Sequence, residues 1–384
     1  MIPDVRTAHA NLGRWIEAQD YKGWDPFDGL SSRLFRSLPG IRGNRFFRLL
    51  WLQAFKRSPL NLRRLVSVPK QANPKAHALL IRAYCRQDIN TMKGKLLRLL
   101  DEIRDMVQPG YHGACWGYPF DWQARAFYQP AGTPTVVATS YVGSSLLDAY
   151  QVLKDASLLD LARSACDFVL KDLNRSFDDE GDFAFSYSPL DSTQVFNATL
   201  LGARLLSGVY ALTREPCLIE AAEKAVSFVC RRQRPDGAWP YSPLEFHGWV
   251  DSFHTGFNLE CISEYQKNSG DDRFSSVLDA GFRYYIGHFF TADGLPKYFD
   301  TEAYPVDMHS PAQLVVTLDS LRRLDEQAAL VERVMSWSLK NMYDPRRGYF
   351  YFQKHRWGTN PIPYFRWTQA WMYYALTLLL NKGR

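Results

Sequence analysis

A repeat of about 57 residues is the sequence feature that most constrains how this chain folds. Its clearest mark is a glycine close to aromatic residues, placed after a helix-like stretch. The four clear copies have this glycine at Gly181, Gly237, Gly294 and Gly348, at spacings of 56, 57 and 54 residues, and a degenerate copy starts at Gly113. Self-similarity at this period is typical of stacked supersecondary units that cannot bury their apolar faces alone.

Each repeat is predicted to hold two helices. In the first, such as 158–174, apolar residues recur at intervals of three and four with charges between them, as in an amphipathic helix. The second helix follows the glycine turn and a polar loop, and it is more apolar. Six such helices are predicted to begin near Asn73, Thr139, Asn197, His254, His309 and Trp367. The sequence therefore predicts an all-α, single-domain (α/α)6 toroid, with apolar helices inside and amphipathic helices outside.

Residues 1–72 fit the repeat least well. We expect them to form an N-terminal loop leading into the toroid and a basic first outer helix, while 73–384 form the hairpins that close it. From Gly29 to Gln87 there is no acidic residue, whereas the 33–86 block holds thirteen Lys and Arg. Such a block suits an anionic membrane surface or a polyanionic partner. The alternative is a face that packs on an acidic part of the same protein. No nucleic-acid-binding motif accompanies the charge, so nucleic acid is not an expected partner.

Composition narrows the class of protein further. Apolar residues make up 46% of the chain and aromatic residues 15%, enough for a large core and also typical of saccharide or isoprenoid sites. The six cysteines are scattered without a CxxC pair, so we expect buried core residues and neither a metal nor a cofactor. The first residues lack the apolar stretch of a signal peptide, and no run reaches the roughly 20 apolar residues that span a bilayer. The expected location is the cytoplasm.

The starts of all inner helices meet at one end of a toroid, so polar residues there converge in space. The candidate catalytic residues are Asp191, Asp251, His254, Asp307 and His309. The candidate substrate-binding residues are Trp24, Asp28, Trp116, Asp121, Arg125, Tyr187, Gln194, Trp239, Tyr241, Tyr298, Arg366 and Trp367. Aromatic faces stack on sugar rings, and two carboxylates can act as acid and nucleophile or base. A histidine pair can instead move a proton on and off a sugar carbon in an epimerase or lyase. The alternative for each Asp is helix capping.

The densest group of candidates lies between Glu245 and Glu260. Asp251 and His254 are three residues apart at a helix start, so they share a face. Asp307 and His309 repeat the pairing one hairpin later, which makes these four residues the first choice for a polar centre. A histidine satisfied within the core is the alternative at each position.

Two resemblances bear on the fold and the function. Residues 233–239 (QRPDGAW) are similar to the QW-type repeat of terpene cyclases and protein prenyltransferases, which are also toroids. The acidic DxDD and DDxxD motifs of terpene cyclases are absent, and the prenyltransferase zinc set of Asp, Cys and His has no clear counterpart. Residues 23–30, 56–63, 73–76 and 249–258 resemble VpsJ-like toroid proteins of bacterial exopolysaccharide clusters.

The second resemblance implies a role in polysaccharide biosynthesis, without a reaction that transfers residue by residue. N-acylglucosamine 2-epimerases and unsaturated glucuronyl hydrolases offer an analogy of fold. We therefore expect a saccharide-acting enzyme of the glycoside hydrolase, epimerase or lyase type, acting on an oligosaccharide or lipid-linked glycan. The 33–86 block would hold it peripherally at the inner membrane. The alternatives are an isoprenoid-binding toroid and a non-catalytic scaffold that binds glycan.

Overall fold

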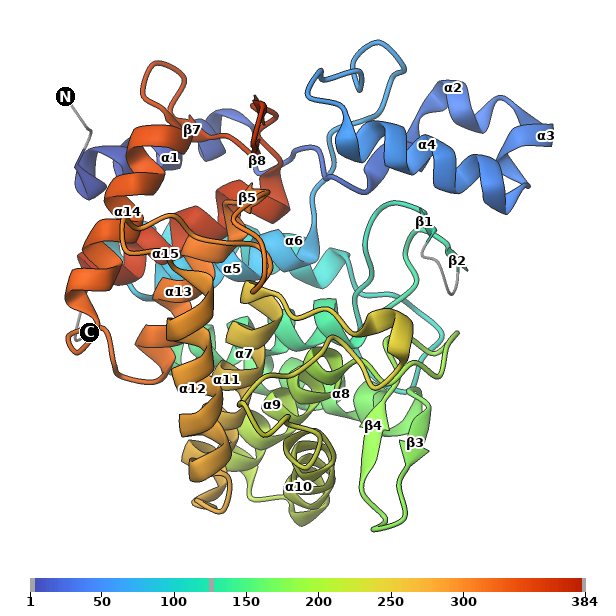
Figure 1. The fold of residues 1–384 in the computed structure, drawn as a ribbon. Coiled ribbons are helices and arrows are strands. Elements are labelled where there is room, and N and C mark those ends of the chain that lie inside the picture. The colour runs from blue at the N-terminus through green and yellow to red at the C-terminus, as the bar shows by residue number, and fades with distance from the viewer. Residues whose placement is uncertain (1–3, 124–127, 382–384) are drawn as a thin grey trace.

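The computed structural model describes residues 4–123 and 128–381 (Figure 1), and the contacts between its helices define an inner and an outer ring. Within these residues the inner ring has six helices, and each packs against the next. The α15–α5 contact closes the ring. The inner helices are α5 (Pro74–Cys85), α7 (Val136–Leu153), α9 (Phe196–Thr213), α11 (Ser252–Ser269), α13 (His309–Ser320) and α15 (Ala370–Leu380). This ring of paired helices confirms the predicted (α/α)6 toroid.

The outer helices cover the inner ring from outside. They are α1 (Val5–Ala18), α6 (Ile89–Asp105), α8 (Ala156–Lys171), α10 (Pro216–Cys230), α12 (Ser275–Phe289) and α14 (Ala328–Met342). Their burial follows the predicted amphipathic pattern: in α8 the buried face includes Leu158, Ala162 and Ala165. The inner helices are buried nearly all round, as α7 is from Val136 to Gly143. The difference in hydrophobic pattern between the two helix types therefore sets which ring each one joins.

The backbone conformation explains why each of these repeats has a glycine at the same place. Gly181, Gly237, Gly294 and Gly348 all have left-handed φ angles, between 75° and 94°, which residues with a side chain rarely adopt. At Gly237 a Cβ atom would also lie 2.4 Å from the carbonyl oxygen of Ala280 in α12. At Gly237, Gly294 and Gly348 the turn therefore approaches the next outer helix closely, whereas Gly181 needs glycine for its φ angle alone.

The last glycine turn identifies the helix that completes the outer ring. Gly348 lies against Asn11 of α1, where a Cβ would be 3.1 Å from the backbone oxygen, and α1 packs on α15. The expected first outer helix in the basic segment is therefore corrected, because α1 fills that position. The basic segment instead forms η1 (Asp28–Ser31), α2 (Arg33–Arg36), α3 (Pro39–Arg42) and α4 (Arg45–Arg57), which project beyond the ring (Figure 1).

Short strands lie in the long connections that run from outer to inner helices. The strand β5 (Val306–Asp307) pairs with β8 (Gln353–His355), which places Asp307 opposite Gln353. The other strands are β1 (Trp122–Gln123), β2 (Tyr128–Gln129), β3 (Arg175–Phe177), β4 (Phe183–Phe185), β6 (Tyr343–Asp344), β7 (Tyr349–Phe350) and β9 (Gly358–Asn360). Across the described part of the chain, no helix combines the length and hydropathy needed to cross a membrane.

Candidate active site

An aspartate–histidine pair stands at the start of α11. Asp251 is the N-cap of this helix, and its Oδ1 accepts a hydrogen bond from the backbone N of His254 (2.9 Å). Its Oδ2 lies 2.6 Å from His254 Nδ1. We assign the Nδ1 proton to this contact, which leaves Nε2 as the basic atom. The Asp251 side chain is buried, whereas His254 is 24% exposed, so the oriented imidazole reaches the solvent side of the site.

A second histidine lies deeper in the same place. His309 begins α13 and is 1% exposed, and its ring stacks on Phe253 with the centroids 4.7 Å apart. Phe253 also contacts His254 at 4.5 Å, so one phenyl ring separates the two imidazoles. Neither ring nitrogen of His309 has a hydrogen-bond partner among the described residues. Burial, together with the neighbouring cationic groups of Lys75 and Arg366, lowers the pKa of His309 well below its ordinary value, so its ring is neutral.

Asp307 is held rigidly beside His309. Its carboxylate accepts hydrogen bonds from Gln353 Nε2 (2.6 Å), from Trp367 Nε1 (3.0 and 3.1 Å) and from the backbone N of His309 (2.9 Å). Complete burial raises the pKa of Asp307 to about 6, and these donors oppose the rise. The carboxyl group therefore anchors the loop before α13 and fixes the Trp367 ring, which meets His309 edge-on at 5.2 Å.

Aromatic rings form the walls around the two histidines. Tyr241 stacks on Trp249 at 4.9 Å and contacts His254 at 4.8 Å. Tyr298 meets Phe253 edge-on at 5.2 Å, and Trp249 is 38% exposed. The rings come from connections that precede α11 and α13, which explains how residues far apart in sequence surround one pair of imidazoles. Flat rings of this kind offer stacking faces to a sugar.

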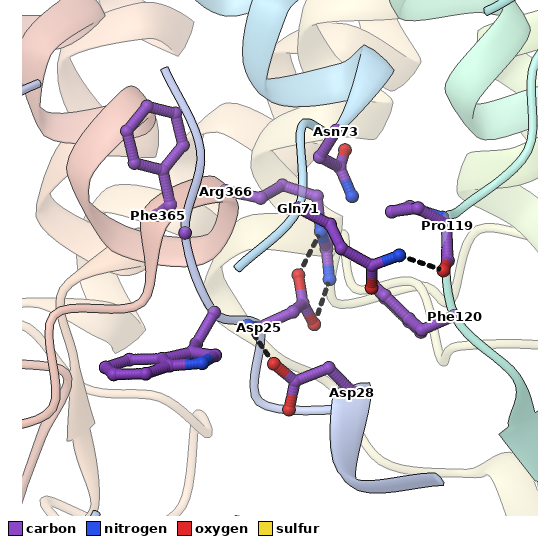
Figure 2. A pocket seen from close by; sticks show the side chains of 10 residues that line it. Asp25, Asp28, Gln71, Asn73, Pro119, Phe120, Phe365 and Arg366 are labelled. Atoms are coloured by element: carbon purple, nitrogen blue, oxygen red, sulfur yellow. Dashed lines mark hydrogen bonds and ion pairs between the residues drawn. The ribbon is translucent and has the colours of Figure 1, made fainter. Parts of the chain in front are cut away.

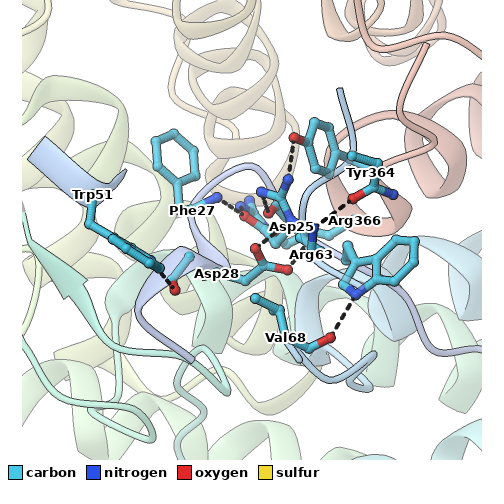
Figure 3. A network of polar contacts seen from close by, with 11 residues as sticks. Asp25, Phe27, Asp28, Trp51, Arg63, Val68, Tyr364 and Arg366 are labelled. Carbon is cyan, nitrogen blue, oxygen red and sulfur yellow. Dashed lines mark hydrogen bonds and ion pairs between the residues drawn. The ribbon is translucent and has the colours of Figure 1, made fainter. Parts of the chain in front are cut away.

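A buried ionic group, which we call the closure network, joins the N-terminal segment to the last inner helix. It consists of Asp25, Asp28, Arg63, Tyr364 and Arg366 (Figure 3). Arg366 donates two hydrogen bonds to Asp25 (2.6 and 2.9 Å), and Arg63 donates to Asp28 (2.7 Å) and to Tyr364 Oη (2.8 Å). Burial raises the pKa of Asp28 to about 6, and the Arg63 charge opposes this. A cavity of about 10 Å³ beside Asp25 and Arg366 has room for a single water (Figure 2). The closure network therefore positions Arg366 and holds the ends of the ring together.

Lys75 lies at the floor of the site, in the first turn of α5. Its ammonium group is over the rings of Tyr141, Phe257 and Trp371, at 4.1, 5.0 and 5.3 Å. The side chain is 3% exposed and makes no ion pair with any described residue. Burial lowers the pKa of Lys75 well below its ordinary value, while cation–π attraction stabilises the charged form.

The structure brings together seven of the predicted residues and separates others from them. Asp251, His254, Asp307, His309, Tyr241, Tyr298 and Trp367 share the aromatic cluster around Phe253. Trp116 and Trp239 are buried in the core instead, where their indole N–H groups donate to Ile103 O and Val229 O. They are therefore corrected from stacking platforms to core residues.

Other predicted residues serve their own loops. The Asp191 carboxylate accepts backbone hydrogen bonds from Tyr187, Ser188 and Thr193, so it stabilises a turn before α9. Asp121 accepts from Ala131 N, and Trp24 Nε1 donates to Val68 O. Tyr187 is buried against Trp122, and Gln194 is half-buried two residues before α9. Arg125 lies outside the described residues.

Sequence reasoning missed three residues of this site. Phe253 separates the histidines, Gln353 holds Asp307, and Lys75 lies under the rings. Lys75 could have been found, because it occupies the start of an inner helix like the other candidates. Gln353 carries no such signal, since it reaches Asp307 only through strand pairing. Among the residues that the structure describes, no three His, Cys, Asp or Glu side chains are grouped to hold a metal ion.

Comparison with known proteins gives structural relatives only. No family model matches the sequence, and no curated protein sequence matches it. The chain is similar to a cellobiose 2-epimerase from Bacillus thermoamylovorans B4167 (TM-score 0.62, 13% identity), covering 82% of this chain and 90% of that one. It is also similar to a family 76 glycoside hydrolase (mannosidase) from Bacteroides thetaiotaomicron VPI-5482 (0.60, 11%, 99% of both chains). A third similar structure is a D-mannose isomerase (0.58, 12%, 80% and 87%). At these identities the likeness concerns the fold.

Proposed function

We propose that the protein is a saccharide-acting enzyme of the epimerase or isomerase type, in which His254 removes and returns a proton at a sugar carbon. The observation that carries this proposal is the Asp251–His254 pair beside the neutral His309. A general base works by having an oriented lone pair within reach of the substrate, and the partly exposed His254 ring, held at Nδ1 by Asp251, fits this role. Structural relatives that include sugar epimerases and an isomerase support the same reading.

The two imidazoles fit complementary steps. His254 takes the proton from the carbon next to the carbonyl group of an open-chain sugar, and negative charge develops on the carbonyl oxygen. A neutral His309 donates one N–H to that oxygen, as an uncharged imidazole can. Return of the proton from His254 to the same carbon gives the epimer when the enediolate has rotated to present its opposite face. Return to the neighbouring carbon, with the hydroxyl proton passed to the former carbonyl oxygen, gives the isomer. Asp251 stabilises the imidazolium of His254 between these steps.

Glycoside hydrolysis is the second candidate, favoured by the raised pKa of Asp307. A carboxyl with a pKa of about 6 suits a general acid. Against this, the Asp307 oxygens already accept hydrogen bonds from Gln353 and Trp367, whereas the ring nitrogens of His309 have no partner among the described residues. Asp251 is likewise occupied by α11 and His254. We therefore rank proton transfer by histidine above carboxylate catalysis.

One experiment in D2O distinguishes the two reactions. Wild-type protein and His254→Gln are incubated with mannose, glucose, cellobiose and manno-oligosaccharides, and products are read by NMR and mass spectrometry. The proposal expects deuterium at the carbon next to the carbonyl. In His254→Gln the rate of incorporation should fall by a factor of about 10² or more. Shortened glycans without deuterium would establish the hydrolase instead. Deuterium incorporation at equal rates in both proteins would refute the role of His254.

The proposal extends to where the enzyme works: on a lipid-linked glycan of exopolysaccharide or envelope assembly, at the cytoplasmic face of the inner membrane. The resemblance of 249–258 to exopolysaccharide-cluster proteins supports this context. The α2–α4 segment (residues 33–57) supports a membrane contact, because Leu34, Phe46, Phe47 and Leu50 are 41–67% exposed there. Phe46 and Leu50 lie four residues apart on one helix face, and no acidic residue accompanies them.

Flotation with liposomes tests the membrane contact. Wild-type protein is expected to float with vesicles containing anionic lipid and to be released as salt rises, because its attraction is partly electrostatic. The double variant Phe46→Ser, Leu50→Ser should lose flotation. A matched double variant at Phe177 and Leu190, which are exposed elsewhere on the ring, should keep it. Equal flotation of both variants would exclude the α2–α4 segment as the contact.

A further inference from the structure

A polar cavity lies at the end of the toroid opposite the histidines. It has a volume of about 440 Å³ and is lined by the later parts of α5, α11 and α13, by the turn after α13 and by Tyr374 of α15. Along α11, Asp251 stands at the start and Glu264, which lines the cavity, stands thirteen residues later, a rise of roughly 20 Å. The cavity is therefore separate from the aromatic site, although the same helices reach both.

The charges around this cavity are balanced. Arg82, Arg86, Lys267 and Arg322 supply the cationic groups, and Glu260, Glu264, Asp319 and Asp325 supply the same number of carboxylates. An ion of either sign would meet attraction and repulsion together, because both kinds of charge line one space. The lining therefore favours a ligand without net charge that can both donate and accept hydrogen bonds.

Several polar contacts on the wall are longer than an ordinary direct hydrogen bond. The Lys267–Glu264 contact spans 3.9 Å, Arg82 Nη1 lies 3.5 Å from Glu260, and Ser320 Oγ lies 3.4 Å from Glu264. Direct hydrogen bonds between such groups are about 2.7–3.2 Å long. At the other end, His254 and Asp251 are 2.6 Å apart. Lys267 therefore keeps hydrogen-bonding capacity for a ligand, whereas Arg82 and Glu260 are also held by Asp148 and Arg204.

We infer that this cavity is a second carbohydrate site, which binds a neutral monosaccharide or disaccharide. Sugar hydroxyls donate and accept, which matches a lining that holds both carboxylates and cationic groups. The apolar part of the lining comes from Tyr374, Leu324 and Val316, which expose only small edges to the cavity. The volume falls in the range of about 300–1,000 Å³ that small-molecule sites occupy. This inference does not depend on the reaction proposed above.

Hydrogen–deuterium exchange measured by mass spectrometry tests the second site. Glucose and cellobiose are the neutral probes, and glucuronate and glucose 6-phosphate are the charged ones. We expect the neutral sugars to protect the amides of residues 316–325, in wild type and in Asp251→Asn alike. Absence of protection there by both neutral probes overturns the inference. Protection by the charged probes alone also overturns it, because it would contradict the expected ligand class.

Two neighbouring arginines provide a matched control. Arg322 lines the cavity, whereas Arg323 pairs with Asp279 (3.1 Å) on the outside. Arg322→Ala and Asp319→Asn are expected to weaken binding of the neutral sugar about fivefold, the effect of one lost hydrogen bond. Arg323→Ala should bind as wild type does. Equal affinities of Arg322→Ala, Asp319→Asn and wild type, with unchanged melting temperatures, would refute the assignment.

Discussion

The two ends of the toroid are built from the same six helices but differ in chemistry. Around the helix starts, His254 and His309 lie among aromatic rings, and the carboxylates of Asp251 and Asp307 make short hydrogen bonds. Around the helix ends, charged groups line an open cavity in which several pairs lie 3.4–4.0 Å apart. The comparison matches the two proposals, in which the helix starts hold the catalytic histidines and the helix ends bind a polar ligand reversibly.

The difference follows from the lengths of the connections. At the helix ends, inner helices pass directly to outer ones, through residues 154–155 after α7 and 214–215 after α9. At the helix starts, the connections are long, such as 231–251 before α11 and 343–369 before the main part of α15. Long connections bring strands and aromatic side chains over the ring, whereas short ones leave it uncovered. Loop length therefore decides which end can hold a closed site.

The largest expected effect concerns the buried ion pair of Glu260 and Arg204, which lies between the two ends of the toroid. Glu260 is 2% exposed and accepts a 2.5 Å hydrogen bond from Arg204, so Glu260→Gln leaves a buried guanidinium without its counter-charge. We expect the free energy of unfolding to fall by about 3–5 kcal/mol, measured by urea denaturation. Glu326→Gln, which removes the exposed partner of Arg323, should change it by less than about 1 kcal/mol. Equal losses from Glu260→Gln and Glu326→Gln would mean that the buried ion pair stabilises the fold no more than the exposed one.

A pH dependence is expected at the aromatic end. Burial raises the pKa of Asp307 to about 6, above the ordinary 3.8, so the folded protein binds the proton more tightly than the unfolded chain. The contribution of Asp307 to the free energy of unfolding is therefore complete below its ordinary pKa of 3.8. It is lost as pH rises through about 6, by up to about 3 kcal/mol. The free energy of unfolding of wild type, relative to that of Asp307→Asn, should therefore fall as pH rises from 4 to 7.5. A constant difference would place the Asp307 pKa near 3.8.

Catalysis should depend on one helix cap and not on another. Asp251→Asn keeps a good N-cap for α11 but removes the charge that stabilises His254. We expect the rate of deuterium incorporation into sugar to fall about 10²-fold, with little change in melting temperature. Asp155→Asn makes the same chemical change at the N-cap of the outer helix α8 and should leave the rate unchanged. Similar rates for Asp251→Asn and wild type would mean that Asp251 only caps its helix.

The smallest expected effect concerns the glycine turns near the aromatic end. Gly181→Ala places a Cβ in open space at a left-handed φ, which costs about 1 kcal/mol. Gly237→Ala adds a clash, because its Cβ would lie 2.4 Å from the Ala280 oxygen. We expect Gly237→Ala to lower the free energy of unfolding by at least about 1 kcal/mol more than Gly181→Ala. Equal losses in thermal denaturation would show that the turn moves away from α12 freely.

Much of the fold was predictable because each repeat states its own structure. The glycine turns, the amphipathic outer helices and the apolar inner helices follow from local patterns, and the structure confirms the toroid that they predict. The outer helix at the closure was not predictable in the same way. Val5–Ala18 lacks a glycine turn of its own, and its position depends on contact with Gly348 and α15, more than 300 residues away.

The residues of the candidate site were also predictable only in part. Sequence position alone indicated Asp251, His254, Asp307 and His309, because residues at helix starts converge when a ring closes. The aromatic residues were harder to place, since Trp116, Trp239 and Trp367 look alike in sequence but only Trp367 lies in the site.

The sequence by itself determined the repeat, the two helix types and the end of the ring at which histidines gather. Only the tertiary structure decided which side chains touch: Phe253 between two imidazoles, Gln353 on Asp307, and Lys75 over three rings. The physical reason is that periodicity fixes the face and the end of a helix on which a residue lies. Side-chain contacts depend instead on packing between segments that are distant in sequence and joined by loops without a repeating pattern.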